Sequence, residues 1–123
     1  MPPRRRIDAQ DGRAAVTAWA RTHPGPVPRE VLATAVRWSL EELAARAPGG
    51  TTEVRVPPFA AVQCLEGPRH TRGTPPNVVE TDPVTWLALA TGRLDWAGAV
   101  ADGAVRASGE RADLSALLPL LPA

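Results

Sequence analysis

Apolar residues recur at helical spacing in the first third of the chain. The pattern predicts a first helix over about 8–21, and the stretch 23–26, His-Pro-Gly-Pro, ends it because proline cannot continue a helix. A second helix begins near Pro28, a residue that suits the first helical position, and ends before the Pro-Gly-Gly stretch at 48–50. One apolar stripe runs along this second helix: Leu32, Val36, Leu40, Leu43 and Ala47.

The period then changes from helical to alternating, which indicates strands. Thr52, Val54 and Val56 alternate with charged residues, as in a strand with one buried face. After a Pro-Pro interruption, the run 59–65 has small or apolar residues on both faces, which favours a strand near the middle of the sheet. We expect these two strands to be adjacent and antiparallel.

The second half of the chain mixes short strands with capped helices. The pattern over Asn77 to Thr81 predicts a third strand. Asp82 and Asp95 each precede an apolar segment, and aspartate is a preferred residue at the N-cap of a helix. A fourth strand is predicted over about 104–108. A terminal helix is predicted with one leucine face, formed by Leu114, Leu117, Leu118 and Leu121.

Strands grouped in mid-chain between helices predict an α+β fold, with a mostly antiparallel sheet of four to five strands covered by helices. At 123 residues and 13.0 kDa the chain fits one domain. We assign 1–7 to a disordered basic tail and 8–123 to that single domain.

Composition and charge exclude several classes of protein. The net charge is +1, so no strong field favours a nucleic-acid partner, and no apolar run approaches the length of a stable membrane insertion. The chain has arginine and no lysine, which we interpret as the result of a GC-rich coding sequence and not as an adaptation for binding. The N-terminus lacks the apolar stretch of a signal peptide, which predicts a cytoplasmic protein.

Few residues have the pattern of a catalytic or metal site. His23, His70 and Cys64 are too scattered to act as convergent metal ligands, so no metal or cofactor is predicted. Cys64 lies within an apolar strand, where cysteine behaves as a small buried hydrophobe. The connection 66–77 gathers Arg69, His70 and Arg72, which either bind an anion or are simply solvated.

Aromatic residues are unusual in kind, with four tryptophans, one phenylalanine and no tyrosine. Each tryptophan falls in a predicted helix. Packing in the core is the ordinary role of such residues, and lining an apolar cavity under the helices is the alternative. The four are Trp19, Trp38, Trp86 and Trp96.

Three segments together resemble the sterol-carrier-protein (SCP-2-like) superfamily, and in particular the short actinobacterial sterol carrier family proteins. They are 54–64, Val-Arg-Val-Pro-Pro-Phe-Ala-Ala-Val-Gln-Cys; 82–94, Asp-Pro-x-x-Trp-Leu-x-Leu-Ala-x-Gly-Arg-Leu; and 102–120, from Asp-Gly-x-Val-x-Ala-Ser-Gly to the terminal leucines. The similarity extends over essentially the whole chain. Each motif alone is weak, and the collective pattern is fairly specific.

The resemblance implies five strands, an apolar tunnel between sheet and helices, and a non-catalytic protein whose partner is a lipid or another apolar small molecule. Side chains expected to face that tunnel are Val62, Trp86, Leu89, Leu114, Leu117 and Leu118. Two alternatives stay open: an interaction module with a closed core that acts as a homodimer or accessory subunit, and an enzyme that uses the Arg69–Arg72 loop.

Overall fold

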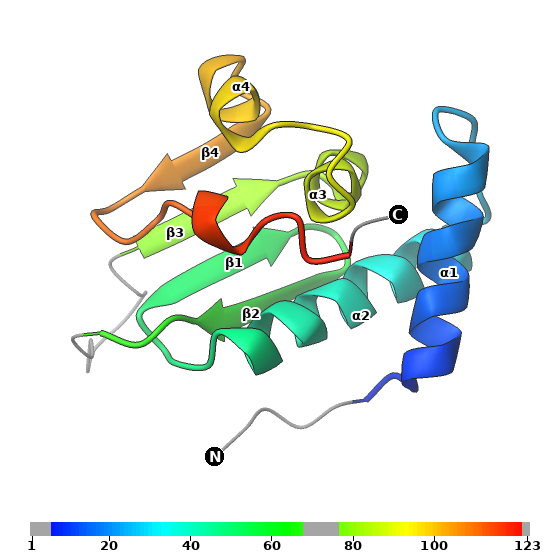
Figure 1. Cartoon of the computed structure of the whole chain (residues 1–123), viewed down its shortest axis with the longest axis horizontal. Coiled ribbons are helices and arrows are strands. Elements are labelled where there is room, and N and C mark those ends of the chain that lie inside the picture. The colour runs from blue at the N-terminus through cyan, green and yellow to red at the C-terminus, as the bar shows by residue number, and fades with distance from the viewer. Residues whose placement is uncertain (1–5, 68–76, 122–123) are drawn as a thin grey trace.

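Four helices and a four-stranded sheet make up the described part of the computed structural model, which covers residues 6–67 and 77–121 (Figure 1). This is the α+β class that the sequence predicts. In chain order the elements are α1 Ala9–Thr22, α2 Arg29–Arg46, β1 Thr52–Val56, β2 Ala60–Cys64, β3 Asn77–Thr81, α3 Pro83–Ala90, α4 Trp96–Ala101, β4 Val105–Ser108 and the 3-10 turn η1 Ser115–Leu117.

The sheet is open and mixed, in the order β2-β1-β3-β4. β1 pairs antiparallel with β2 and parallel with β3, while β3 pairs antiparallel with β4. Val54 is central, with Val62 opposite it on one side and Val79 on the other. The described residues contribute four strands to this sheet, not the five that the resemblance implies.

β2 lies at an edge of the sheet formed by the described residues, so the prediction that it lies near the middle of the sheet is wrong. The antiparallel pairing with β1 is as predicted, but the other side of β1 is taken by β3. The apolar run was misleading because its residues are small. Ala61 points outward and is exposed together with Gln63, and leaving a single methyl group in contact with water costs little free energy.

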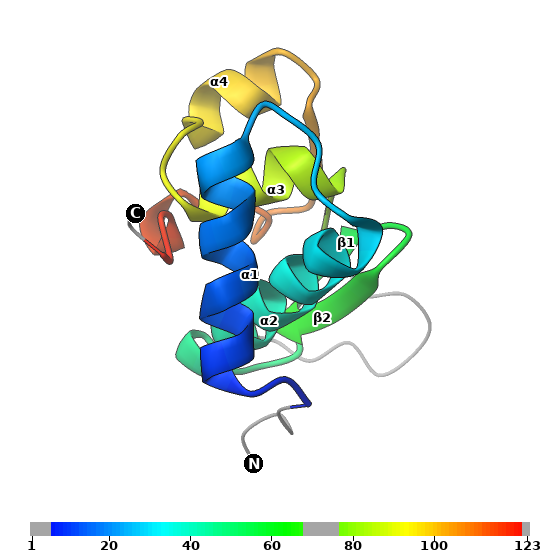
Figure 2. The same ribbon diagram turned by 90° about the vertical axis from the view of Figure 1, so that its right-hand side faces the viewer.

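Helices cover one face of the sheet. Thr52, Val54 and Val56 are fully buried on that face, whereas Glu53 and Arg55 on the other face are partly exposed and form an ion pair. α2 packs on β2 and α3, and α1 packs across α2; Figure 2 shows α2 between α1 and β2. The molecule therefore has a sheet layer and a helix layer, with α1 outside both.

Local signals located the short helices correctly. The Asp82 carboxylate accepts a hydrogen bond from the Thr85 amide at 2.8 Å, and that of Asp95 accepts one from the Gly98 amide at 3.2 Å. Both acids satisfy backbone donors that the first turn of a helix leaves free.

The terminal leucines do not form the predicted helix. After the single turn η1, residues 118–121 form a non-helical strap, and the amides of Leu120 and Leu121 both donate to the carbonyl of Ala90 at the end of α3. Pro119 explains the difference, since it has no amide to donate and disfavours helical backbone in the residue before it. Leu114 and Leu120 are the buried anchors of this segment.

Candidate ligand pocket

The space between sheet and helices, where a tunnel was expected, is occupied by packed side chains. Trp86, Leu89 and Leu114 are each at most 1% exposed and belong to the core cluster. The Trp86 indole donates to Ser39 Oγ at 2.8 Å, and that hydroxyl donates to the carbonyl of Val36, which ties α3 to α2. The other expected tunnel residues are half-buried against the same core: Val62, Leu117 and Leu118.

The remaining candidates from the sequence are the arginine and histidine residues of the loop after β2, and Cys64. Arg69, His70 and Arg72, with the rest of their loop, lie outside the described residues. Cys64 is fully buried, and desolvation raises the pKa of its thiol to about 11, as expected of a structural cysteine.

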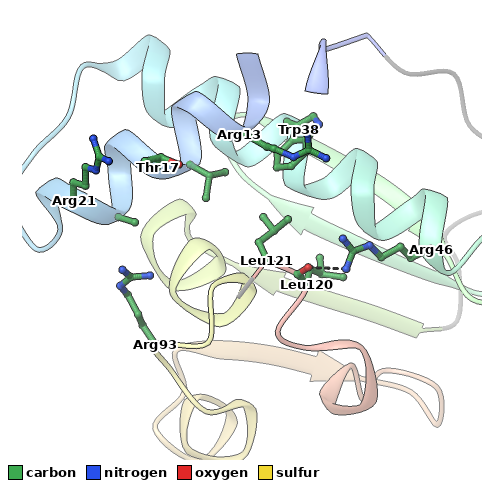
Figure 3. Close-up of a pocket in the computed structure, with 10 residues that line it drawn as sticks. Arg13, Thr17, Arg21, Trp38, Arg46, Arg93, Leu120 and Leu121 are labelled. Atoms are coloured by element: carbon green, nitrogen blue, oxygen red, sulfur yellow. Dashed lines mark hydrogen bonds between the residues drawn. The ribbon is translucent and has the colours of Figure 1, made fainter. Parts of the chain in front are cut away.

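A pocket of about 550 Å³ lies on the other side of the helix layer. α1 forms one side of it, α2 another, and the strap 118–121 and the turn after α3 complete it (Figure 3). None of the six tunnel residues named above is among its lining residues. Its apolar wall consists of Val16, Ala20, Trp38, Leu120 and Leu121.

Trp38 reaches this wall because α1 crosses α2 at a glycine. A Cβ atom on Gly12 would lie 2.1 Å from Cγ of Trp38, so only glycine lets the indole pack flat against α1. The ring is 2% exposed, and its Nε1 has no hydrogen-bond partner among the described residues. Trp38 thus packs at the edge of the core and also forms part of the pocket.

Cationic side chains surround the apolar wall. The guanidinium of Arg13 lies 5.9 Å from the centroid of the Trp38 ring, and that of Arg93 lies 5.8 Å from the Trp19 ring. Arg46 donates to the Leu120 carbonyl at 2.6 Å and pairs with Glu42 at 3.1 Å. Thr17 and Arg21 complete the polar lining.

Sequence reasoning missed this pocket, although one signal was present. Arg13, Thr17 and Arg21 are four residues apart, which places them on one face of α1 beside Val16 and Ala20. These three side chains are exposed, and Val16 and Ala20 lie at the border between that face and the core. The residues that α1 faces, Arg93 and the strap, come from distant parts of the chain and had no such signal.

No helix in the described part of the chain is long and apolar enough to cross a membrane. The same residues contain no cluster of three or more His, Cys, Asp or Glu side chains that could hold a metal ion.

The sheet, its helix layer and the sequence together define a sterol-carrier-like α+β protein. A family model described as bacterial SCP ortholog, where SCP stands for sterol carrier protein, matches residues 28–120. The chain therefore belongs to this family. No curated protein matches the chain. The match begins just before α2, so the α1 side of the pocket lies outside the matched region.

Proposed function

We propose that this protein is a non-catalytic carrier that binds a lipid-like small molecule in the pocket between α1, α2 and the strap. The observation that supports this is the pocket itself. Its volume of about 550 Å³ falls within the range of about 300–1,000 Å³ typical of small-molecule sites. Its mixture of aliphatic wall and a few polar groups suits a ligand that is mostly apolar.

Binding would be driven by removing apolar surface from water, at roughly 25 cal/mol per Å². Ala20 and Leu121, which are partly exposed, offer that surface, while Val16 and Trp38, which are already buried, form a packed apolar wall behind it. The membership of the SCP family supports a carrier role, and the lining of arginines, one threonine and apolar side chains supports binding rather than catalysis. A cytoplasmic location is part of this proposal.

The test is native mass spectrometry of protein purified from its own host, followed by organic extraction. We expect an apolar compound at about one per chain, released on denaturation. Ala20→Phe places a ring in the pocket and should abolish the adduct, whereas Ala97→Phe, at an exposed position of α4, should retain it. A wild-type protein without bound compound, which also fails to bind added lipids, would contradict the proposal.

A second candidate is an interaction module that acts as a dimer or accessory subunit. The close packing of Trp86, Leu89 and Leu114 favours it, because it closes the tunnel that the resemblance implies. Sedimentation equilibrium distinguishes the two: this candidate requires a dimer mass or a bound protein, and a ligand-loaded monomer contradicts it.

A further inference from the structure

The pocket lining carries charge of one sign. Arg13, Arg21, Arg46 and Arg93 line it, and no carboxylate does among its described lining residues. All four arginines are exposed to solvent, and together they give the pocket a positive potential that no carboxylate of its described lining balances. The lining therefore favours a ligand that itself carries a negative charge.

The four arginines are not equally available. Arg46 is already engaged by Glu42 and by the Leu120 carbonyl, so it fixes the strap in place. Arg21 and Arg93 have no carboxylate within ion-pair distance in the part of the chain that the structure describes. Figure 3 shows these two toward one end of the pocket, with Arg46 toward the other and Leu121 between.

Arg93 also lies near an aromatic ring. Its Cζ atom is 5.8 Å from the centroid of the Trp19 ring, which is within cation–π range, and this contact uses none of its N–H donors. Those donors can bind a carboxylate or phosphate in the paired geometry that a guanidinium favours.

The abundance of arginine in this chain does not account for the cluster. On the outer face of the sheet, Arg55 pairs with Glu53, and Arg106 pairs with Glu80 at 3.1 Å. Charges on that face are thus balanced, whereas those at the pocket are not. An acidic ligand is therefore supported by where these arginines lie, without carboxylate partners at the pocket, and not by how many arginines the chain has.

We infer that the ligand is an amphiphile with an acidic head group, carboxylate or phosphate, bound by Arg21 and Arg93 while its apolar chain lies against Val16, Ala20 and Leu121. This inference rests on the proposed function and deepens it. It assigns the selection of the ligand to Arg21 of α1 and to Arg93 in the turn after α3. Of these two segments, α1 lies outside the region matched by the family model.

The experiment compares three probes of equal chain length by isothermal titration calorimetry: dodecanoate and dodecyl phosphate, each below its micelle concentration, and dodecanol below its solubility limit. For the wild-type protein we expect one of the acids to bind about tenfold or more tightly than the alcohol, as charge-assisted hydrogen bonds would give. Which acid binds more tightly identifies the head group.

In the variant Arg21→Gln/Arg93→Gln we expect that preference to disappear, with dodecanol binding unchanged. Arg106→Gln, on the outer face of the sheet, is the matched control and should behave as wild type. Equal binding of acids and alcohol by the wild-type protein would overturn this inference and leave the proposed function standing. A loss of dodecanol binding in the double variant would also overturn it, since the arginines would then only support the fold. Absence of binding of all three probes would overturn both.

Discussion

Gly12 of α1 packs against the buried indole of Trp38, and replacing this helical glycine by alanine is expected to destabilise the protein, opposite to the usual effect of that substitution. Alanine is favoured over glycine in a helix by about 1 kcal/mol. At position 12, however, the added Cβ would lie 2.1–2.5 Å from three atoms of the buried indole, and overpacking of this kind costs about 1–3 kcal/mol. We therefore expect Gly12→Ala to lower the free energy of unfolding, by up to about 2 kcal/mol once the helix gain is subtracted from the overpacking cost, measured by urea denaturation.

Gly98 in α4 is the matched control. The nearest atom to a Cβ built there is Asp95 Oδ2 at 3.9 Å, an ordinary contact, so Gly98→Ala should raise stability by a few tenths to about 1 kcal/mol. If both variants were stabilised to the same extent, the close packing of α1 on Trp38 would be wrong.

Cys64 gives the fold a pH dependence in alkaline solution. Burial raises the pKa of its thiol from 9.0 to about 11, so folding favours the neutral thiol over the thiolate. The stability from this difference is fully present below pH 9 and is lost as the pH rises to about 11, by about 2–3 kcal/mol in all. The chain has no tyrosine and no lysine, so no other side chain type titrates in that window.

Urea denaturation at several pH values between 8 and 11 measures this loss. In Cys64→Ala the stability should be nearly flat over the same range, although lower at pH 8 because of the lost side-chain atoms. A wild-type protein whose stability does not change up to pH 11 would show that the thiol is not desolvated.

Among the elements, the strap 118–121 connects the core to the pocket. Leu120 is 2% exposed, its amide binds Ala90, and its carbonyl binds Arg46, while Leu117 in η1 is only half-buried. Leu120→Ala should therefore cost about 2–5 kcal/mol of stability, as buried leucine truncations do, and Leu117→Ala distinctly less. Thermal unfolding of the two variants measures the difference, and equal losses would mean that the strap is not anchored as described.

Elements with local signals were predictable from the sequence, and those set by distant contacts were not. Asp82 and Asp95 cap helices through residues three positions away, and the alternation around Val54 describes a strand without reference to its neighbours. The position of β2 at the edge of the described sheet follows from the pairing of β1 with β3, a strand from a later part of the chain. The strap depends on a proline that overrides a helical leucine pattern.

The same limit applies to the whole molecule. The resemblance correctly indicated the family and the α+β class. It also implies a tunnel beneath the helices, where Trp86 and Leu114 are packed in the core. The pocket described above combines α1, α2, the turn after α3 and the strap, four segments that only the tertiary structure brings together. A helix face with Arg13, Thr17 and Arg21 could have indicated one wall, and no local pattern could have supplied the others.

Because the pocket is formed only by the folded chain, ligand binding should stabilise the whole molecule. At a free ligand concentration of about 100 times Kd the gain is about 2.7 kcal/mol, which raises Tm by about 10 °C in a domain of this size. Differential scanning fluorimetry with the acidic dodecyl probe that binds more tightly measures the shift. Ala20→Phe should lose it and Ala97→Phe should keep it. An equal shift in Ala20→Phe would place the bound probe outside the pocket, because a filled pocket leaves the folded state no preferential site for the probe.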